Sequence, residues 1–266
     1  MNNDSKIESW ISGQPETHRA PSVSVVIPAY NEYRRLPVAL MNTIDYLDSK
    51  CTGDFTYEIL VVDDGSSDET SEVVRKFEKI RPAVKLIRLP KNYGKGHAVR
   101  LGVLNAHGEK VLFADADGAT PIQEIERLIK AIDEGADVAI GSRAMFSKET
   151  SVKTVWYRKF LGRSFNRFVN LLVLPGIADT QCGFKMFKAK AAKFLFEQQQ
   201  SDGFSFDVEI LFIARKIGLT IREVPINWTN VPGSKVNLLV DSMKMVRDIL
   251  VFKFRHAALT PENFKD

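Results

Sequence analysis

The sequence predicts an α/β fold with a mainly parallel central sheet flanked by helices. Three observations carry this prediction. Short β-branched runs alternate with helical stretches through the first half of the chain. Each predicted strand of this first half ends in a cluster of polar residues and glycines. The length of 266 residues is enough to bury one large core without help from disulfides. Strands that alternate with helices favour parallel pairing, with both faces of the sheet covered.

The predicted elements alternate regularly as far as residue 141. Short apolar runs predict buried strands at residues 23–27, 58–62, 84–88, 110–114 and 137–141. Helical stretches between them are expected at residues 35–48, 69–79, 97–106 and 121–133. The last of these helices is preceded by Thr120 and Pro121, with Gln123 three residues after the threonine, which is a capping-box sequence.

The second half of the chain is less regular. Its predicted elements are a basic, aromatic helix at residues 153–173, a strand at 184–187, helices at 189–196 and 206–217, a strand at 220–228 and an amphipathic helix at 237–255. We therefore expect a flexible leader over residues 1–20, one main domain over residues 21–235, and a C-terminal amphipathic helix and tail over residues 236–266.

The composition is that of an ordinary globular protein, with 26% charged and 44% hydrophobic residues. A net charge of +4 suits an anionic ligand or an acidic membrane surface and is too weak to indicate nucleic acid, which we do not expect as a partner. The two cysteines lack metal-ligand spacing, and a reducing compartment is expected. Residues 1–21 are polar and predict neither a signal peptide nor a spanning helix, so membrane contact is expected to be peripheral.

Polar and glycine-bearing clusters follow five of the predicted strands. They cover residues 28–32, 63–65, 92–96, 115–118 and 141–143. In a parallel sheet these strand ends share one edge, and ligands bind in the crevice there. The sequence therefore predicts a binding site at this edge.

Asp115 and Asp117 are the strongest candidates for metal ligands. They flank one residue, and in an extended segment residues two apart point the same way. Two such carboxylates suit a hard divalent cation that also holds a diphosphate. A simple turn is the alternative, because Asp-Gly is a turn dipeptide. The other clusters beside the pair favour the metal.

The neighbouring clusters suggest contacts to a nucleotide. Asp63 and Asp64 could cap the next helix, but the residues at 66–68 already supply caps, which leaves a carboxylate for a base or ribose. The glycine-rich turn at residues 92–96, with Gly94 and Lys95, suits close approach by a phosphate or sugar. It is not a Walker loop, and no G-x-G-x-x-G follows the first strand, which argues against a dehydrogenase.

Taken together, Val-Ile-Pro-Ala-Tyr-Asn-Glu (26–32), Val-Val-Asp-Asp-Gly-Ser (61–66) and Asp-Ala-Asp (115–117) resemble family 2 glycosyltransferases, which have the GT-A nucleotide-diphospho-sugar transferase fold. The stretches at residues 92–96, 114–120, 141–143, 179–185, 206–209, 227–229 and 233–235 are similar to the dolichyl-phosphate β-glucosyltransferases within that family. The similarity spans residues 22–255. Eukaryotic enzymes of this group carry an N-terminal membrane helix, which this sequence does not predict.

The resemblance implies an inverting enzyme that transfers glucose from UDP-glucose to a polyprenyl (dolichyl or undecaprenyl) phosphate at the cytoplasmic face of a membrane. It implies that residues 21–235 form the GT-A catalytic domain and that the cofactor is Mg²⁺ or Mn²⁺ on Asp115 and Asp117. A mannosyl or N-acetylhexosaminyl donor, a soluble polysaccharide-building transferase and a non-catalytic nucleotide-sugar binding or scaffold protein are the alternatives. A homo-oligomer is left open.

The resemblance also implies individual roles. The nucleotide would be cradled by Pro28, Tyr30, Glu32 and Asp63. Arg143 and Lys235 would face phosphates of donor or acceptor, although Lys235 could equally be a solvated loop lysine. Asp117, Asp179 and Arg143 are the catalytic candidates, with Asp179 as the base or orienting group. The alternative for Asp179 is a structural ion pair with Lys185 or Arg143.

Two amphipathic segments suggest the membrane contact. In the first, Lys159, Arg163 and Arg167 recur every four residues beside an aromatic stripe, which is typical of an interfacial helix. In the last helix the apolar stripe consists of Leu239, Met243, Val246, Leu250 and Phe254. The alternative for both stripes is packing on the core or on a partner subunit.

Overall fold

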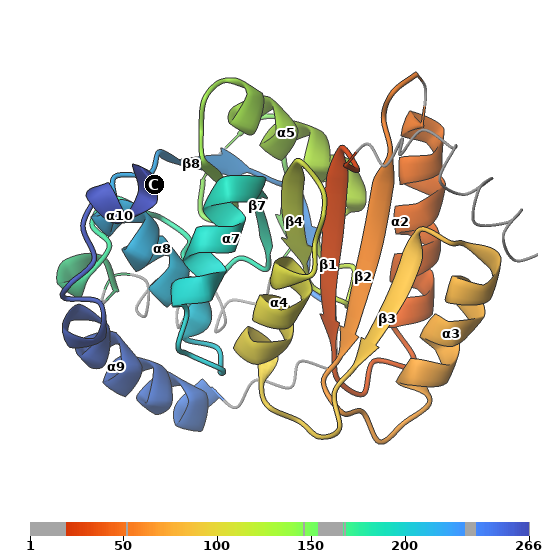
Figure 1. Ribbon diagram of the computed structural model, residues 1–266, viewed down its shortest axis with the longest axis horizontal. Coiled ribbons are helices and arrows are strands. Elements are labelled where there is room, and N and C mark those ends of the chain that lie inside the picture. The colour runs from red at the N-terminus through yellow and green to blue at the C-terminus, as the bar shows by residue number, and fades with distance from the viewer. Residues whose placement is uncertain are drawn as a thin grey trace, which may run out of the picture.

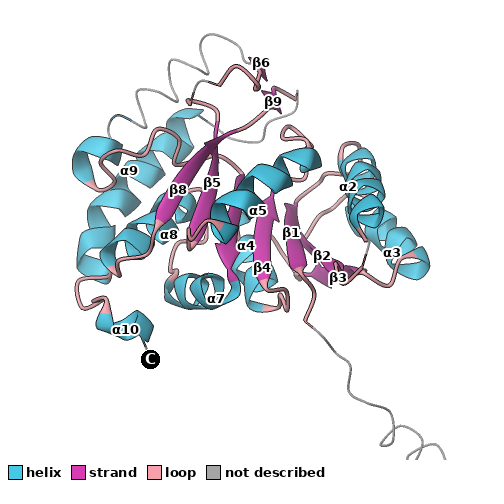
Figure 2. Ribbon diagram, turned by 90° about the horizontal axis from the view of Figure 1, so that it is seen from above, coloured by secondary structure: helices cyan, strands magenta, loops and turns pink. Residues whose placement is uncertain are grey.

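The computed structural model describes residues 20–51, 53–145, 147–153, 167, 169–231 and 238–265. Within these ranges the chain forms a seven-stranded sheet with helices on both faces (Figures 1 and 2). Residues 1–19 of the expected leader and most of the expected basic, aromatic helix lie outside the described residues. None of the helices described is both long and apolar enough to cross a bilayer.

The sheet is parallel except at one strand. Its order is β3-β2-β1-β4-β7-β5-β8, and β7 runs antiparallel to both β4 and β5. The prediction of a mainly parallel α/β fold is therefore confirmed. A separate two-stranded pair joins β6 (Val152–Lys153) to β9 (Trp228–Thr229). The seven strands of the main sheet are β1 (Val23–Ala29), β2 (Tyr57–Asp63), β3 (Val84–Arg88), β4 (Lys110–Ala114), β5 (Val138–Ser142), β7 (Phe184–Lys188) and β8 (Ile221–Pro225).

Helices cover the two faces of the sheet through two separate hydrophobic clusters. The alternation of strand side chains divides them: Val25 and Ile27 face one cluster, and Val26 faces the other. The first face carries α2 (Leu36–Lys50), α3 (Thr70–Ile80) and α5 (Ile125–Asp133), the last preceded by the 3-10 turn η1 (Ile122–Glu124). The second face carries α4 (Lys95–Leu104), α7 (Ala189–Gln198), α8 (Phe206–Lys216) and α9 (Leu238–Arg255), with the short α10 (Glu262–Lys265) near the end of the chain.

Three local expectations differ from the structure. Helix α4 begins at Lys95, two residues earlier than expected, because Gly94 adopts a φ of 116° as its N-cap. The structure places the N-cap at Pro121 and not, as the capping-box sequence predicts, at Thr120, and the chain makes a 3-10 turn there before α5 begins. The strand expected at residues 220–228 is divided, because β8 ends at Pro225 and β9 pairs elsewhere.

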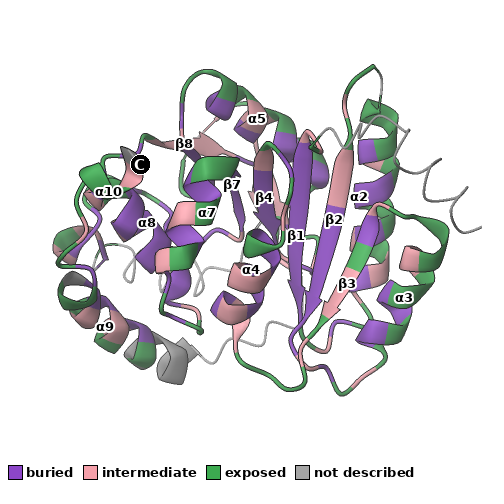
Figure 3. Ribbon diagram, in the orientation of Figure 1, coloured by how far each residue is buried: buried purple, intermediate pink, exposed green. Residues whose placement is uncertain are grey.

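Helix α9 packs on the core through a face other than the expected stripe. Met245, Ile249 and Phe252 are buried, and the last two belong to the same hydrophobic cluster as α8. Leu250 and Phe254 are 55% and 82% exposed, and Figure 3 shows both buried and exposed residues along α9. The alternative in which the expected stripe packs on the core is therefore wrong for these two residues.

Candidate functional site

A cleft of about 830 Å³ opens where the strand order reverses between β1 and β4. The carboxyl ends of β1, β2 and β3 lie together at the lower edge of the sheet in Figure 1. Ligands of open α/β sheets bind at such a reversal. Residues at or beyond the ends of β1, β2, β3 and β4 form one wall, and the loop before α8 and the middle of α9 form the other. The lining residues are Pro28, Ala29, Tyr30, Glu32, Arg35, Asp64, Asn92, Tyr93, Gly94, Lys95, Ala98, Asp115, Ala116, Asp117, Gly203, Phe204, Ser205, Lys244, Met245, Arg247 and Asp248.

Most of the predicted site residues meet in this cleft. Those that line it are Pro28, Tyr30, Glu32, Gly94, Lys95, Asp115 and Asp117. Asp63, Arg143 and Asp179 are described residues that are not part of its lining. Lys235 lies outside the described residues. Four of the five predicted clusters therefore converge on one cleft.

The loop after β1 is fixed to the loop after β2. The backbone N–H of Asn31, whose φ is 52°, donates to Ser66 Oγ at 2.8 Å. The N–H of Glu32 donates to Thr70 Oγ1 at 2.8 Å. The carboxylate of Glu32 in turn accepts two hydrogen bonds from Arg35, at 2.7 and 2.5 Å. This wall of the cleft is therefore rigid before any ligand binds.

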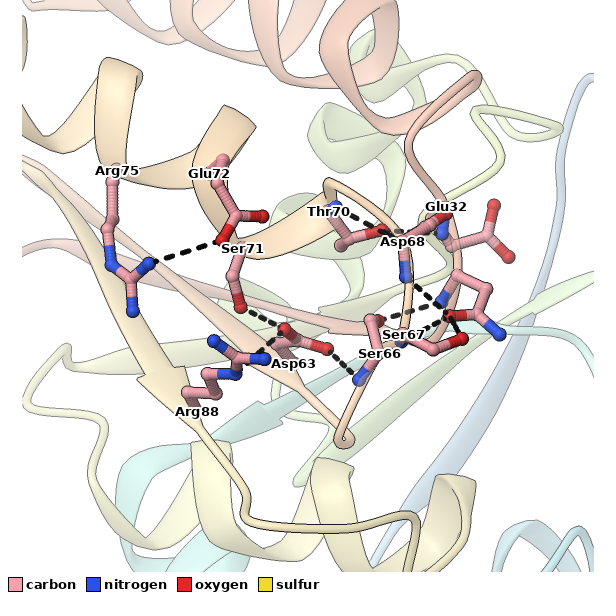
Figure 4. A network of polar contacts seen from close by, with 11 residues as sticks. Glu32, Asp63, Ser66, Ser67, Asp68, Thr70, Ser71, Glu72, Arg75 and Arg88 are labelled. Atoms are coloured by element: carbon pink, nitrogen blue, oxygen red, sulfur yellow. Dashed lines mark hydrogen bonds and ion pairs between the residues drawn. The ribbon is translucent and has the colours of Figure 1, made fainter.

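The two adjacent aspartates after β2 have different environments. Asp63 is fully buried, where it accepts from the backbone N–H of Ser66 at 2.9 Å and from the hydroxyl of Ser71 (Figure 4). Asp64 lines the cleft and accepts from the backbone N–H groups of Tyr93 and Gly94, at 2.8 and 2.9 Å. Its carboxylate therefore shapes the glycine-rich turn, while that of Asp63 ties β2 to α3.

The backbone of Gly183 passes close to the side chain of Asp115. The N–H of Asp115 donates to Gly183 O at 3.0 Å, and Asp115 Oδ1 lies 2.7 Å from Lys95 Nζ. A Cβ atom placed on Gly183 would lie 2.0 Å from Asp115 Oδ2. The missing side chain at Gly183 is therefore what leaves room for the carboxylate.

Asp115 and Asp117 form a pair of like charges. Burial raises the pKa of Asp117 above its ordinary value, and the charge of Asp115 raises it further. Asp117 Oδ1 accepts from the N–H of Ala119 at 3.0 Å. The pair offers the hard oxygen ligands that a divalent cation prefers, so the residues fit such an ion. The described residues hold no group of three or more His, Cys, Asp or Glu side chains that could bind a metal, so further ligands would come from a diphosphate or water.

A buried ion pair lies beneath the acidic pair. Lys185 is fully buried and contacts the carboxylate of Asp207, which is 3% exposed. Lys185 Nζ also donates to Cys182 O at 2.6 Å. Lys95 and Lys185 both approach the ring of Phe113, at 5.2 and 5.6 Å from its centroid. Two ion pairs therefore lie near the same ring: Lys95 with Asp115 at the cleft, and Lys185 with Asp207 in the core.

Arg143 and Asp179 form an ion pair beside the cleft. Two guanidinium nitrogens of Arg143 lie 2.7 and 2.9 Å from the carboxylate, and the backbone N–H of Arg143 adds a third bond at 3.0 Å. Burial alone would raise the pKa of Asp179, but the charge and hydrogen bonds of Arg143 outweigh it and hold the pKa below its ordinary value. Of the alternatives for Asp179, the structure contains the pairing with Arg143.

Arg35, Lys244 and Arg247 line the cleft, although the sequence predicted no role there for them. Of the two aspartates considered for a base or ribose, Asp64 lines the cleft and Asp63 does not. The charge of Arg35 acts on both Asp115 and Asp117. Lys244 and Arg247 are exposed residues of α9, three apart and hence on one face of the helix. The sequence spacing predicts that the two cations share one face of the helix, but it does not show that this face borders the cleft.

The comparisons with known proteins agree with this architecture. Residues 24–196 match the family model described as glycosyl transferase family 2. Proteins named dolichyl-phosphate beta-glucosyltransferase are similar over most of the chain. The Mus musculus protein is 42% identical over 88% of this chain and 75% of its own length. The Homo sapiens protein is 40% identical over 92% and 80%, and the Saccharomyces cerevisiae protein 39% over 88% and 75%.

Solved structures share the fold at low sequence identity. Mannosyl-3-phosphoglycerate synthase from Rubrobacter xylanophilus superimposes with a TM-score of 0.67 at 17% identity, covering 90% of this chain and 76% of that one. Glucosyl-3-phosphoglycerate synthase from Mycobacterium tuberculosis, in complex with Mn²⁺ and uridine-diphosphate-glucose, gives a TM-score of 0.61 at 16% identity, with coverage of 93% and 81%.

Proposed function

Because the chain belongs to glycosyl transferase family 2, we propose that it transfers glucose from UDP-glucose to dolichyl phosphate, giving a β-linked product. The observation that carries this proposal is the cleft in which Pro28, Tyr30 and Glu32 meet the Asp115/Asp117 pair. The identity of about 40% to dolichyl-phosphate beta-glucosyltransferases over most of the chain supports the choice of donor and acceptor.

The walls of the cleft suggest how the two substrates are held. We place the nucleoside against Pro28, Tyr30 and Asp64, and the diphosphate between Lys95 and the acidic pair, where a Mg²⁺ or Mn²⁺ ion would neutralise the leaving diphosphate. The acceptor phosphate is placed at Lys244 and Arg247, the cations of the opposite wall. Lys235, which lies outside the described residues, is proposed as a further phosphate contact.

The reaction needs little proton transfer. The acceptor phosphate is already ionised near neutrality, so its oxygen can attack the anomeric carbon directly while the bond from that carbon to the diphosphate oxygen breaks. Attack from the face opposite the diphosphate converts an α-linked donor to a β-linked product. Asp179, with a lowered pKa and three hydrogen bonds from Arg143, is a poor base at neutral pH. We propose that Asp179 orients Arg143 beside the site. Asp63, which ties β2 to α3, is likewise proposed to support the site without contacting the substrates.

A transfer assay tests the proposed function. The purified chain is incubated with UDP-glucose, GDP-mannose or UDP-N-acetylglucosamine, with dolichyl or undecaprenyl phosphate, and with Mn²⁺, Mg²⁺ or EDTA. We expect glucose to enter the organic phase with dolichyl phosphate and to stay out of it in EDTA. Hydrolysis of the donor without lipid product in every combination would refute the proposed acceptor, and transfer of another sugar would refute the donor.

Gly183→Ala should impair metal binding and turnover more than stability. The new methyl group would force the carboxylate of Asp115 aside, since that side chain can rotate whereas the backbone pairing of β4 and β7 cannot shift easily. We expect kcat/KM to fall by about 10²-fold, with a melting temperature close to that of the wild type. Gly218→Ala is the control with the opposite expected result. Gly218 has a φ of 80° and nothing within 4 Å of an added Cβ atom, so the substitution strains the backbone alone. It should lower the free energy of unfolding by about 1 kcal/mol and leave the activity unchanged. Equal activity in Gly183→Ala and wild type would contradict the proposed role of Asp115.

We also propose that α9 brings the protein to the cytoplasmic face of a membrane. The middle of α9 lines the cleft through Lys244 and Arg247, and its C-terminal part exposes Leu250 and Phe254. Apolar side chains beside cations are the pattern of a helix that lies in an anionic lipid interface. The two free cysteines are in keeping with a reducing compartment.

Vesicle flotation tests this membrane contact. Leu250→Glu/Phe254→Glu should reduce co-flotation with anionic vesicles by more than about tenfold, because burying each apolar side chain is worth roughly 1.5–3 kcal/mol. The matched control is Val38→Glu/Ile80→Glu, which changes exposed residues of α2 and α3 on the opposite side of the molecule (Figure 1). If the α9 substitutions instead lowered the sedimenting mass and left flotation intact, a homo-oligomer would explain the exposed stripe.

A further inference from the structure

Lys95 has a fixed backbone and a side chain that reaches the cleft. It is the first residue of α4, and the glycines on either side of it lie against the loop at residues 201–203. A Cβ atom on Gly94 would lie 2.4 Å from Asp202 O, and one on Gly96 would lie 2.4 Å from Ser201 O. The loop therefore clamps the backbone, and movement at this position is left to the long side chain of Lys95.

The ammonium group of Lys95 forms an ion pair with Asp115, one of the two carboxylates suited to a metal. Its Nζ lies 2.7 Å from Asp115 Oδ1, and its side chain is 21% exposed. Without ligands, Lys95 is therefore an ion-pair partner in direct contact with Asp115.

We propose that Lys95 is a placeholder cation, which holds Asp115 until a donor diphosphate enters and then moves onto the diphosphate, releasing the carboxylate oxygen to the metal ion. The identity of the donor rests on the proposed function. The competition between Lys95 and a cation for Asp115 follows from the ion pair alone.

This arrangement couples the two ligands. In the absence of nucleotide, a divalent cation must displace Lys95 from Asp115 and then lies close to a like charge that has lost its partner. With a diphosphate present, both the cation and Lys95 have anionic oxygens to bind. Metal and nucleotide should therefore strengthen each other's binding, and by linkage the effect is the same in both directions. The protein would bind the metal weakly until the donor is present.

The test is the affinity for Mn²⁺ alone, measured from the electron paramagnetic resonance signal of the free ion. Lys95→Met should bind Mn²⁺ about fivefold more tightly than the wild type, as expected when a partly exposed ion pair no longer competes. Lys95→Arg, which keeps the charge, should bind as weakly as the wild type. The charge control is Lys244→Met, which removes a cation from the same cleft without breaking the pair with Asp115. It should change the affinity by less than twofold.

A second titration with UDP present completes the test. UDP should tighten Mn²⁺ binding in the wild type by a larger factor than in Lys95→Met. The proposal is overturned if Lys95→Met binds Mn²⁺ alone no more tightly than the wild type, or if Lys244→Met gains as much. Thermal unfolding checks each variant, and Lys95→Gln replaces Lys95→Met if the latter is not folded. Absence of UDP binding in every protein would refute the proposed donor, while the titration with Mn²⁺ alone would still decide the role of Lys95.

Discussion

Asp117→Asn is expected to lower glucosyl transfer by about 10³-fold while the protein keeps its fold. The substitution removes one of two carboxylates that together bind the cation on the leaving diphosphate, so Mn²⁺ binding in the presence of UDP should be lost as well. Turnover is measured with UDP-glucose and dolichyl phosphate, and metal binding by the free-ion signal. A non-catalytic binding or scaffold protein would have no transfer to lose.

Asp117→Asn should not lower the stability of the protein, and the direction of this effect follows from the pKa of Asp117. The pKa of Asp117 is raised in the folded protein, so the folded state retains a proton to higher pH than the unfolded chain. Stability therefore decreases as pH rises through this range, and at neutral pH the ionised carboxylate is a cost. We expect the melting temperature of Asp117→Asn to equal or exceed that of the wild type. Asp45→Asn, on the exposed side of α2, is the charge control and should keep full activity. Transfer within tenfold of the wild type in Asp117→Asn would contradict the catalytic role.

Lys185→Met should have the largest effect on stability, a loss of about 3 kcal/mol or more in the free energy of unfolding. It leaves the carboxylate of Asp207 buried without its nearest cation and leaves Cys182 O without its donor. Urea denaturation of the wild type and the variant measures the difference.

A double substitution separates the ion pair from simple packing. Lys185→Met/Asp207→Leu removes both charges, and should recover most of the loss because no unpaired charge remains. Burial already raises the pKa of Asp207, so in Lys185→Met the carboxylate should take up a proton readily. The deficit should then shrink as the pH is lowered toward 5. A double variant as unstable as the single one would show that packing around Lys185 matters more than its charge.

The first half of the fold could be predicted because its signals are local. Strands β3 and β4 have the expected bounds, since short apolar runs between turn residues leave little choice. The antiparallel insertion of β7 between β4 and β5 could not be predicted, because it depends on which distant strands pair. The 3-10 turn before α5 also reflects distant contacts: Glu124 accepts from Asn227, and Ala119 O accepts from Thr229 N.

The site shows the same division between local and distant signals. The acidic pair and the glycine-rich turn follow from residue type and position, whereas the choice between Asp63 and Asp64 depends on how the chain turns after β2. Gly65 makes that turn with a φ of 70°, and a Cβ atom there would lie 2.3 Å from the backbone of Lys91. In α9 two apolar stripes compete, and the sequence does not show which one meets α8. Tertiary packing decides both cases.

The late position of β7 in the chain has a consequence for synthesis. Strand β4 is completed at Ala114, yet its second neighbour is made only about seventy residues later, from Phe184 to Lys188. A nascent chain shorter than this holds β4 as an open, apolar edge, a template for pairing with other chains. Truncations that end before Phe184 should therefore aggregate, even though they contain every strand that lines the nucleotide side of the cleft.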